Sequence, residues 1–346
     1  TPESTNIFDV ELTLEEKDGK TVDKVISYFG FRKIHTENGM IYLNNKPYYQ
    51  RLVLDQGYWP EGLLTAPTDE ALKFDIEAAK KLGFNGCRKH QKAEDPRFLY
   101  WADKLGYLVW GECASIPTFG EKQVNRELAL WTEIVERDFN HPSIVCWVPL
   151  NESWGVPGIH GNRQQQHYSQ MLYHYLHSVD PTRLVISNDG WEMTETDICA
   201  IHNYEHGEEA GSKKAQKFAE MFAGRKALTE HPCGAWDVYA KGFHDMGAPI
   251  VLSEFGGIGF DISHDEKKAW GYTSVTDEKE FVEEYRRILD VVLDSPALAG
   301  LCYTQLTDVE QEVNGIMTYD RKWKCAPESI FEINMQYRRR RVQNEE

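Results

Sequence analysis

Two glutamates follow apolar, strand-like segments in separate parts of this sequence. Glu152 comes shortly after the run Ile144–Val148, and Glu254 ends the run Pro249-Ile-Val-Leu-Ser-Glu254. Apolar runs this short and rich in β-branched residues are typical of strands buried on both faces. If both strands belong to a barrel of parallel strands, their carboxyl ends meet at one mouth. Two carboxylates that meet there can cleave a glycosidic bond, one as the acid and the other as nucleophile or base.

The residues beside the two glutamates favour a shared site. One glutamate at a strand end is commonly part of a loop salt bridge, and this is the alternative for each of them. Asn151 directly precedes Glu152, however, and Gly256-Gly257 closely follow Glu254. We therefore predict that both glutamates belong to one active site.

Strand-like and helix-like segments alternate from residue 48 onward. Thr68 and Asp95 are predicted helix N-caps, and Gly83 and Gly106 are predicted to end the same two helices. Eight strands with helices between most of them predict an α/β protein with a (β/α)8 TIM barrel. An open doubly wound sheet is the alternative, but no GxGxxG motif follows an early strand. The predicted strands are 49–54, 84–88, 107–110, 144–148, 184–187, 198–201, 250–253 and 298–303, and the predicted helices are 69–82, 96–105, 124–139, 164–178, 213–223 and 278–293.

Residues 1–34 do not follow the barrel pattern. Apolar and polar residues alternate over 7–14, Asp18-Gly19 supplies a turn, and 25–32 reads as a returning strand. Because a lone hairpin is marginally stable at best, we expect these to be the last strands of a truncated β-sandwich domain. We assign 35–346 to the TIM-barrel catalytic domain, with a second short hairpin at 39–47 leading into it.

Composition limits the partners of this chain. The net charge of −17 would repel nucleic acid and an anionic membrane, so we expect neither as a partner. The one basic run, Arg338–Arg341, is interpreted as a solvated helix end. No stretch approaches the roughly 18 apolar residues of a membrane span. With no signal peptide at Thr1, a cytoplasmic location is the expectation.

The seven cysteines form no CxxC pair. Five of them lie in or just beyond apolar strand-like runs, where a thiol behaves as a small hydrophobic group. We expect reduced cysteines, no metal site and no cofactor. These five are Cys87, Cys113, Cys146, Cys199 and Cys302.

The other predicted strands also end in polar or aromatic residues, a composition that suits a sugar. A metal-dependent hydrolase using His90, His202 and Asp308 is an alternative, but the clustered motifs His-x-His and HExxH are absent from the sequence. The strand-end residues are Arg88, Lys89, His90, Glu112, Asn188, Asp189, Trp191, His202, Asn203, Tyr204 and Asp308.

These motifs resemble the catalytic barrel of glycoside hydrolase family 2, the family of β-galactosidases, β-glucuronidases and β-mannosidases. The resemblance covers roughly residues 35 to 320, and the leading strands look like the end of the family's immunoglobulin-like domain. It implies that N-terminal β-sandwich domains of the same full-length chain are missing here. The matching motifs are Phe84-Asn-Gly-Cys-Arg88-Lys-His90, Trp110-Gly-Glu112, Asn151-Glu152 and Ser253-Glu254-Phe-Gly.

The resemblance implies a role for each glutamate. Glu152 would be the acid/base and Glu254 the nucleophile of a retaining exo-β-glycosidase. The acid would then need a raised pKa while the nucleophile stays ionised. Arg88 is expected to keep Glu254 charged.

The remaining site candidates are expected to contact the sugar or the two glutamates. Asn151 would bind the sugar 2-hydroxyl, and Tyr204, by resemblance, would contact the nucleophile. His90 and His202 would bind sugar hydroxyls or, alternatively, contact the residues that bind the sugar. Trp154 and Trp191 would stack on a sugar ring or fill the core, and Asp189 completes the set.

The sequence also departs from the family pattern. Thr304 stands where family members commonly have a tryptophan. Asn314-Gly-Ile316 lacks the lysine of the Asn-x-Lys motif with which β-glucuronidases bind a carboxylate, so a glucuronide substrate is disfavoured. The first strand end, 54–59, differs as well. A β-galactoside is the expected substrate on family frequency. The alternatives are a β-mannoside, a β-glucuronide, or a barrel that binds carbohydrate without catalysis.

Overall fold

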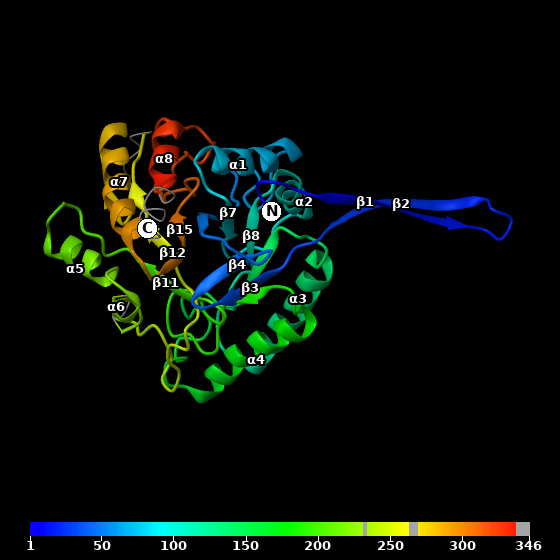
Figure 1. Ribbon diagram of the computed structural model, residues 1–346, viewed down its shortest axis with the longest axis horizontal. Coiled ribbons are helices and arrows are strands. Elements are labelled where there is room, and N and C mark those ends of the chain that lie inside the picture. Colours follow the sequence, from blue (N-terminus) through cyan, green and yellow to red (C-terminus); the bar gives the residue numbers. More distant parts are fainter. Residues whose placement is uncertain (231–233, 263–268, 337–346) are drawn as a thin grey trace.

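Eight parallel strands curl into a barrel in the computed structural model, which describes residues 1–230, 234–262 and 269–336 (Figure 1). Neighbouring strands follow the order β10-β9-β8-β7-β6-β15-β12-β11. A parallel bridge between Gly190 and Ile201 links the segment after β10 to β11 and completes the ring. The TIM barrel is thus confirmed over the open doubly wound sheet. The strands are β6 (Gln50–Asp55), β7 (Gly86–Lys89), β8 (Leu108–Glu112), β9 (Ile144–Val148), β10 (Leu184–Val185), β11 (Cys199–Asn203), β12 (Ile250–Gly256) and β15 (Leu298–Thr304).

Helices cover the outside of the barrel (Figure 1). The Thr68 hydroxyl accepts a hydrogen bond from the Ala71 amide, and the Asp95 carboxylate accepts one from the Arg97 amide, which confirms both predicted N-caps. Two short helices, α6 and α8, were not predicted, because each has fewer residues than a periodic pattern needs. The helices are α1 (Asp69–Lys81), α2 (Pro96–Leu105), α3 (Glu121–Asp138), α4 (Arg163–Val179), α5 (Lys213–Met221), α6 (Arg225–Glu230), α7 (Glu278–Asp294) and α8 (Pro327–Asn334).

The barrel strands are buried on both faces, as their apolar sequences predict. Leu52 and Leu54 of β6 pack in one cluster with Trp110 and Val148, whereas Val53, between them, packs in a second cluster with helix residues. This alternation follows from the opposite directions of successive strand side chains. Both clusters hold the strand ends, and hence the site residues, in fixed positions.

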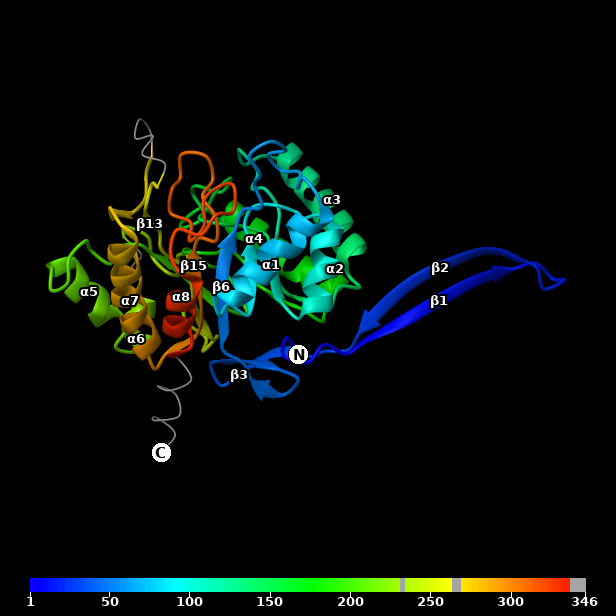
Figure 2. The ribbon, with the colours of Figure 1, turned by 90° about the horizontal axis from the view of Figure 1, so that it is seen from above.

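An antiparallel ribbon of β1 (Ile7–Glu15) and β2 (Thr21–Gly30) extends away from the barrel (Figures 1 and 2). It exposes apolar side chains, including Leu14 at 62% and Ile26 at 65%. The predicted hairpin at 39–47 is confirmed, because β4 (Met40–Leu43) pairs antiparallel with β5 (Lys46–Pro47). A third strand that was not predicted, β3 (Ile34–Glu37), pairs with the other edge of β4. Two short strands, β13 (Ile258–Gly259) and β14 (Thr273–Ser274), pair near the barrel mouth.

Six cysteines are buried free thiols among the described residues, and they include the five singled out in the sequence. The basic run Arg338–Arg341 lies outside the described residues. Within the described part of the chain, every helix is too short or too polar to cross a membrane.

Candidate active site

The carboxyl ends of four barrel strands bring the predicted site residues together. Arg88 lies on β7, His202 on β11 and Glu254 on β12, while Glu152 follows β9. The turn that carries Glu152 is fixed: its amide donates to the Asp189 carbonyl at 2.8 Å. Glu152 itself has a φ of 51°, a left-handed backbone conformation that single residues adopt in tight turns.

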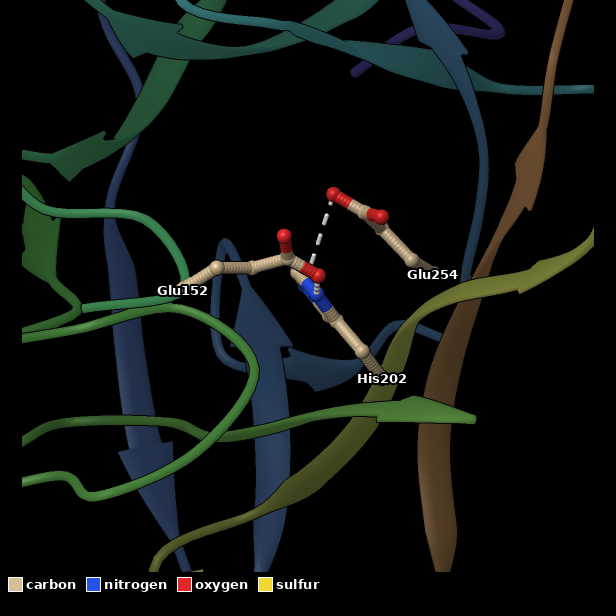
Figure 3. Close-up of side chains that lie close together, drawn as sticks. All are labelled: Glu152, His202 and Glu254. Carbon is tan, nitrogen blue, oxygen red and sulfur yellow. Dashed lines mark hydrogen bonds and ion pairs between the residues drawn. The ribbon is translucent and has the colours of Figure 1, made fainter. Parts of the chain in front are cut away.

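The two glutamates face each other across the mouth (Figure 3). Glu152, His202 and Glu254 each place one side-chain atom within 4.8 Å of the others. Retaining glycosidases hold their carboxyl groups roughly 5–5.5 Å apart, whereas inverting ones need roughly 6.5–9.5 Å to admit a water. The approach of one oxygen from each glutamate to within 4.8 Å fits the shorter of these two spacings.

Arg88 is the fully buried centre of this site. Its Nη1 donates to Glu254 Oε1 at 2.7 Å, and its Nη2 donates to Asn151 Oδ1 at 2.6 Å. Its Nε pairs with Asp189 Oδ2 at 2.9 Å and also donates to Glu112. Several carboxylates offset the cost of burying this guanidinium. As the sequence predicts, Arg88 contacts Glu254, and it aligns that glutamate with Asn151.

His202 links the two glutamates. Its Nδ1 lies 2.8 Å from Glu152 Oε1, and its Nε2 lies 3.1 Å from Asp189 Oδ1 and 3.5 Å from Glu254 Oε1. Burial alone would lower the pKa of His202, but the negative charges of Glu254 and Asp189 and the hydrogen bonds to Asp189 and Glu152 raise it to about 10. His202 is therefore an imidazolium near neutral pH.

The charged His202 lowers the pKa of Glu152, which the sequence predicted to be raised. Burial favours a higher pKa for Glu152. The hydrogen bond and charge of His202, and to a smaller extent the charges of Arg88 and His90, hold that pKa below its ordinary value. The predicted raised pKa of the acid is therefore wrong for the free protein. The proton expected on Glu152 lies on His202 instead.

Tyr204 binds the second oxygen of Glu254. Its hydroxyl donates to Glu254 Oε2 at 2.6 Å and lies 2.9 Å from Thr304 Oγ1. Burial and the negative charge of Glu254 raise the pKa of Tyr204 well above its usual range, so the hydroxyl keeps its proton. The ring stacks on Tyr272 with centroids 3.5 Å apart. Thr304, at the position where the family commonly has tryptophan, thus helps to hold Tyr204.

The aromatic and histidine candidates surround this centre. The Trp191 ring meets His202 edge-on at 5.7 Å and stacks on Trp236 at 5.5 Å. His90 Nδ1 lies 3.0 Å from Arg88 Nη2, and the side chain stays 15% exposed. Trp154 is 60% exposed, so its ring is free to meet a ligand.

Asp189 is fully buried. It pairs with Arg88 and His202 and also accepts a hydrogen bond from the Ser253 hydroxyl. These contacts position its two charged neighbours, and any effect of Asp189 on a ligand passes through them.

A polar group at the mouth was missed in the sequence. Gln56 Nε2 donates to Gln305 Oε1 at 2.9 Å and to Glu312 Oε2 at 3.2 Å. The positions of Gln56 and Gln305 directly after the first and last strands were a usable signal. Glu312 and Tyr272 lie in loops without periodic sequence, where no local pattern marks them.

A metal ion would have to compete for ligands that are already paired. Within the described chain, the metal-compatible group at this mouth is Glu152, His202 and Glu254. Asp308, part of the alternative metal set, instead pairs with Lys324 Nζ at 2.6 Å. Among the described residues, Asp308 and His90 are not grouped with His202 as possible metal ligands.

Comparison with known proteins identifies the family. The family model "Glycosyl hydrolases family 2, TIM barrel domain" matches residues 34–339. The chain is 31% identical over 209 residues to a beta-galactosidase of Photobacterium profundum, covering 57% of this chain and 19% of that protein. It is 32% identical over 215 residues to a beta-galactosidase of Pseudoalteromonas haloplanktis, covering 59% and 20%. The chain thus spans about a fifth of the length of these curated relatives.

Solved structures share the fold at lower identity. A GH2 beta-galacturonidase from Eisenbergiella tayi bound to galacturonate superposes with a TM-score of 0.74 at 20% identity, over 97% of this chain and 59% of that one. A Bifidobacterium dentium beta-glucuronidase complexed with coumarin-3-O-glucuronide gives a TM-score of 0.76 at 19% identity, over 96% and 54%. With the family match over most of its length, the chain belongs to glycosyl hydrolase family 2 and forms its TIM barrel domain.

Proposed function

We propose that this barrel is a retaining exo-β-glycosidase in which Glu254 is the nucleophile and Glu152 the acid/base. The observation that carries the proposal is the close approach of the two carboxylates, since one oxygen of Glu152 lies within 4.8 Å of one oxygen of Glu254. The roles follow from their partners. Arg88 and Tyr204 each bind one oxygen of Glu254 and orient it for attack, whereas Glu152 lies against a proton-carrying histidine.

In the first step, Glu254 attacks the anomeric carbon while the bond to the leaving oxygen breaks. The ester that forms removes the negative charge of Glu254, which is the largest of the interactions that raise the pKa of His202. As that charge is lost, His202 passes its proton through Glu152 to the leaving oxygen while the glycosidic bond breaks. This leaves a neutral His202, an ionised Glu152 and a covalent glycosyl-enzyme.

In the second step, Glu152 acts as a base. It takes a proton from water as the water oxygen attacks the anomeric carbon and displaces Glu254. The returning charge of Glu254 makes His202 basic again, so the proton moves back to the imidazole. The protein ends in its starting charge state, and one water has been consumed.

For the substrate we propose a β-galactoside. The support is sequence similarity to proteins named beta-galactosidase at 31% and 32% identity. A β-uronide is the second candidate, because the similar solved structures include a beta-galacturonidase and beta-glucuronidases. A β-mannoside, and sugar binding without turnover, are the remaining alternatives.

Intact mass after incubation with 2-fluoro aryl glycosides tests the activity. Galactose, glucose, mannose and glucuronic acid derivatives would be compared, and the adduct located by peptide mapping. We expect one adduct, on Glu254, and none in Glu254→Gln. An adduct on Glu152 would reverse the two roles. Sugar binding without any adduct would favour the non-catalytic barrel.

We also propose that residues 1–34 are strands of a β-sandwich domain and that 35–346 form the catalytic domain. The apolar side chains exposed on β1 and β2 support this, because a second sheet packed against them would bury these side chains. Replacing residues 11–26 with an Asn-Gly turn keeps the contacts of Glu3 with Tyr48 and of Thr5 with Lys104, so it should leave the thermal unfolding of the barrel unchanged. Loss of a cooperative transition in this variant would contradict the division.

A further inference from the structure

Glu312 is an acidic side chain at the barrel mouth that the proposed reaction does not use. Its Oε1 accepts a hydrogen bond from Asn314 Nδ2 at 3.1 Å, and its Oε2 accepts one from Gln56 Nε2 at 3.2 Å. A carboxylate can accept about four hydrogen bonds, so these two donors leave acceptor capacity. The side chain is only partly buried, so this capacity is available to a ligand.

The backbone around Glu312 is fixed on both sides. Glu312 and Val309 exchange backbone hydrogen bonds of 3.0 and 3.1 Å across a tight turn, and Trp270 bonds to both neighbours of Glu312. The two buried amides Gln305 and Asn314 hold each other at 2.7 Å beneath it. Groups held in place before a ligand arrives cost little to organise on binding.

Contacts connect Glu312 to the nucleophile. Gln305, which shares Gln56 with Glu312, directly follows Thr304, and Thr304 contacts Tyr204 on Glu254. Burial raises the pKa of Glu312, its two hydrogen bonds oppose this, and the negative charge of Glu254 raises it further. The negative charge of Glu254 therefore acts on Glu312.

The buried cations nearby are already paired. Arg88 is bound by Glu254, Asp189 and Glu112, and the His202 imidazolium lies against Glu152 and Asp189. Lys324 binds Asp308 at 2.6 Å and the Val313 carbonyl at 2.9 Å. A second carboxylate brought here by a ligand would meet the charge of Glu312 without any of these three cations free to offset it. Like charges this close in a partly dehydrated site repel strongly.

We propose that Glu312 determines specificity for the sugar, accepting hydrogen bonds from hydroxyls of a neutral sugar and excluding a uronate. This proposal rests on the proposed glycosidase function and narrows the substrate class of that enzyme. Gln56 and Asn314 orient the carboxylate for this task. The same charge that repels a uronate strengthens its bonds to neutral hydroxyls, since hydrogen bonds to ionised acceptors are the stronger kind.

Kinetics with a neutral and a charged substrate test the role of the Glu312 charge. Values of kcat/KM for 4-nitrophenyl β-galactoside and β-galacturonide would be measured for the wild type, Glu312→Gln and Glu310→Gln. Glu310→Gln is the matched control, because Glu310 is an exposed residue of the same tight turn. We expect Glu312→Gln to lower the galactoside-to-galacturonide ratio about tenfold or more. The control should leave the ratio within about twofold.

Several outcomes would overturn the proposal. A wild-type protein that prefers the galacturonide, or a ratio unchanged by Glu312→Gln, excludes the role of Glu312. Absence of turnover together with absence of an adduct on Glu254 would instead count against the glycosidase function. In that case, NMR titration with galactose and galacturonate makes the same comparison on binding. Galacturonate binding gained only in Glu312→Gln supports the proposal, and equal wild-type binding of both sugars contradicts it.

Discussion

His202 Nδ1 lies 2.8 Å from Glu152 Oε1, and the proton shared by this pair is held by the histidine. Two negative neighbours, Glu254 and Asp189, place it there. The acid of the proposed reaction is therefore the pair, and its protonation depends on the charge of the nucleophile across the mouth.

The stability of the barrel should fall as pH rises between about 6.5 and about 10. In this window folded His202 binds a proton that the unfolded chain has lost, so unfolding becomes easier as pH increases. The stabilisation is complete below the unfolded pKa of 6.5 and lost as pH passes the folded value of about 10. Urea unfolding across this range should give a shallower decline for His202→Gln. The exposed His174→Gln serves as control and should keep the wild-type slope; equal slopes in all three proteins would contradict the charge state of His202.

Glu152→Gln should lose activity according to the leaving group. General acid catalysis contributes about 10²–10⁴-fold, and a poor leaving group needs it most. Alkyl β-glycosides should therefore lose far more kcat/KM than dinitrophenyl β-glycosides, and azide should restore turnover by replacing the activated water. The exposed Glu133→Gln on α3 is the control. Equal losses with both kinds of leaving group would argue against Glu152 as the acid.

Arg88→Met should destabilise the protein by about 3–5 kcal/mol, because it leaves several buried carboxylates without their shared cation. Urea denaturation at neutral pH measures this loss. Exposed Arg97→Met, as control, should leave the stability close to that of the wild type. Wild-type stability of Arg88→Met would show that the carboxylates find other partners.

Tyr204→Phe should slow the reaction without unfolding the site. It removes the donor to Glu254 Oε2 but keeps the ring stacked on Tyr272. Loss of one preorganised donor costs about 10²–10³-fold in kcat. Thr304→Val keeps that donor and loses only its second partner, so its effect should be smaller. A larger effect for Thr304→Val would place the important contact elsewhere.

The interactions between the site residues depend on contacts across the barrel. The positions of Glu152, Glu254 and Arg88 were predictable, because each follows or ends a short apolar strand. The lowered pKa of Glu152 was not predictable, since its cause lies on β11, 50 residues away in the chain. Glu312 was missed for a similar reason. Its partner Gln56 directly follows the first barrel strand, and no local pattern links that residue to the loop of Glu312.

By itself, the sequence determined the barrel strands, most helices and the caps at Thr68 and Asp95, because periodicity and capping depend on residues close together in the chain. It also determined which end of the strands carries the polar residues. Only the tertiary structure decided the closure of the ring at Gly190 and Ile201, the extra strand β3 and the location of the shared proton. Strand closure and protonation depend on backbone pairs and charges brought together from distant segments, so the fold has to be complete before either is set.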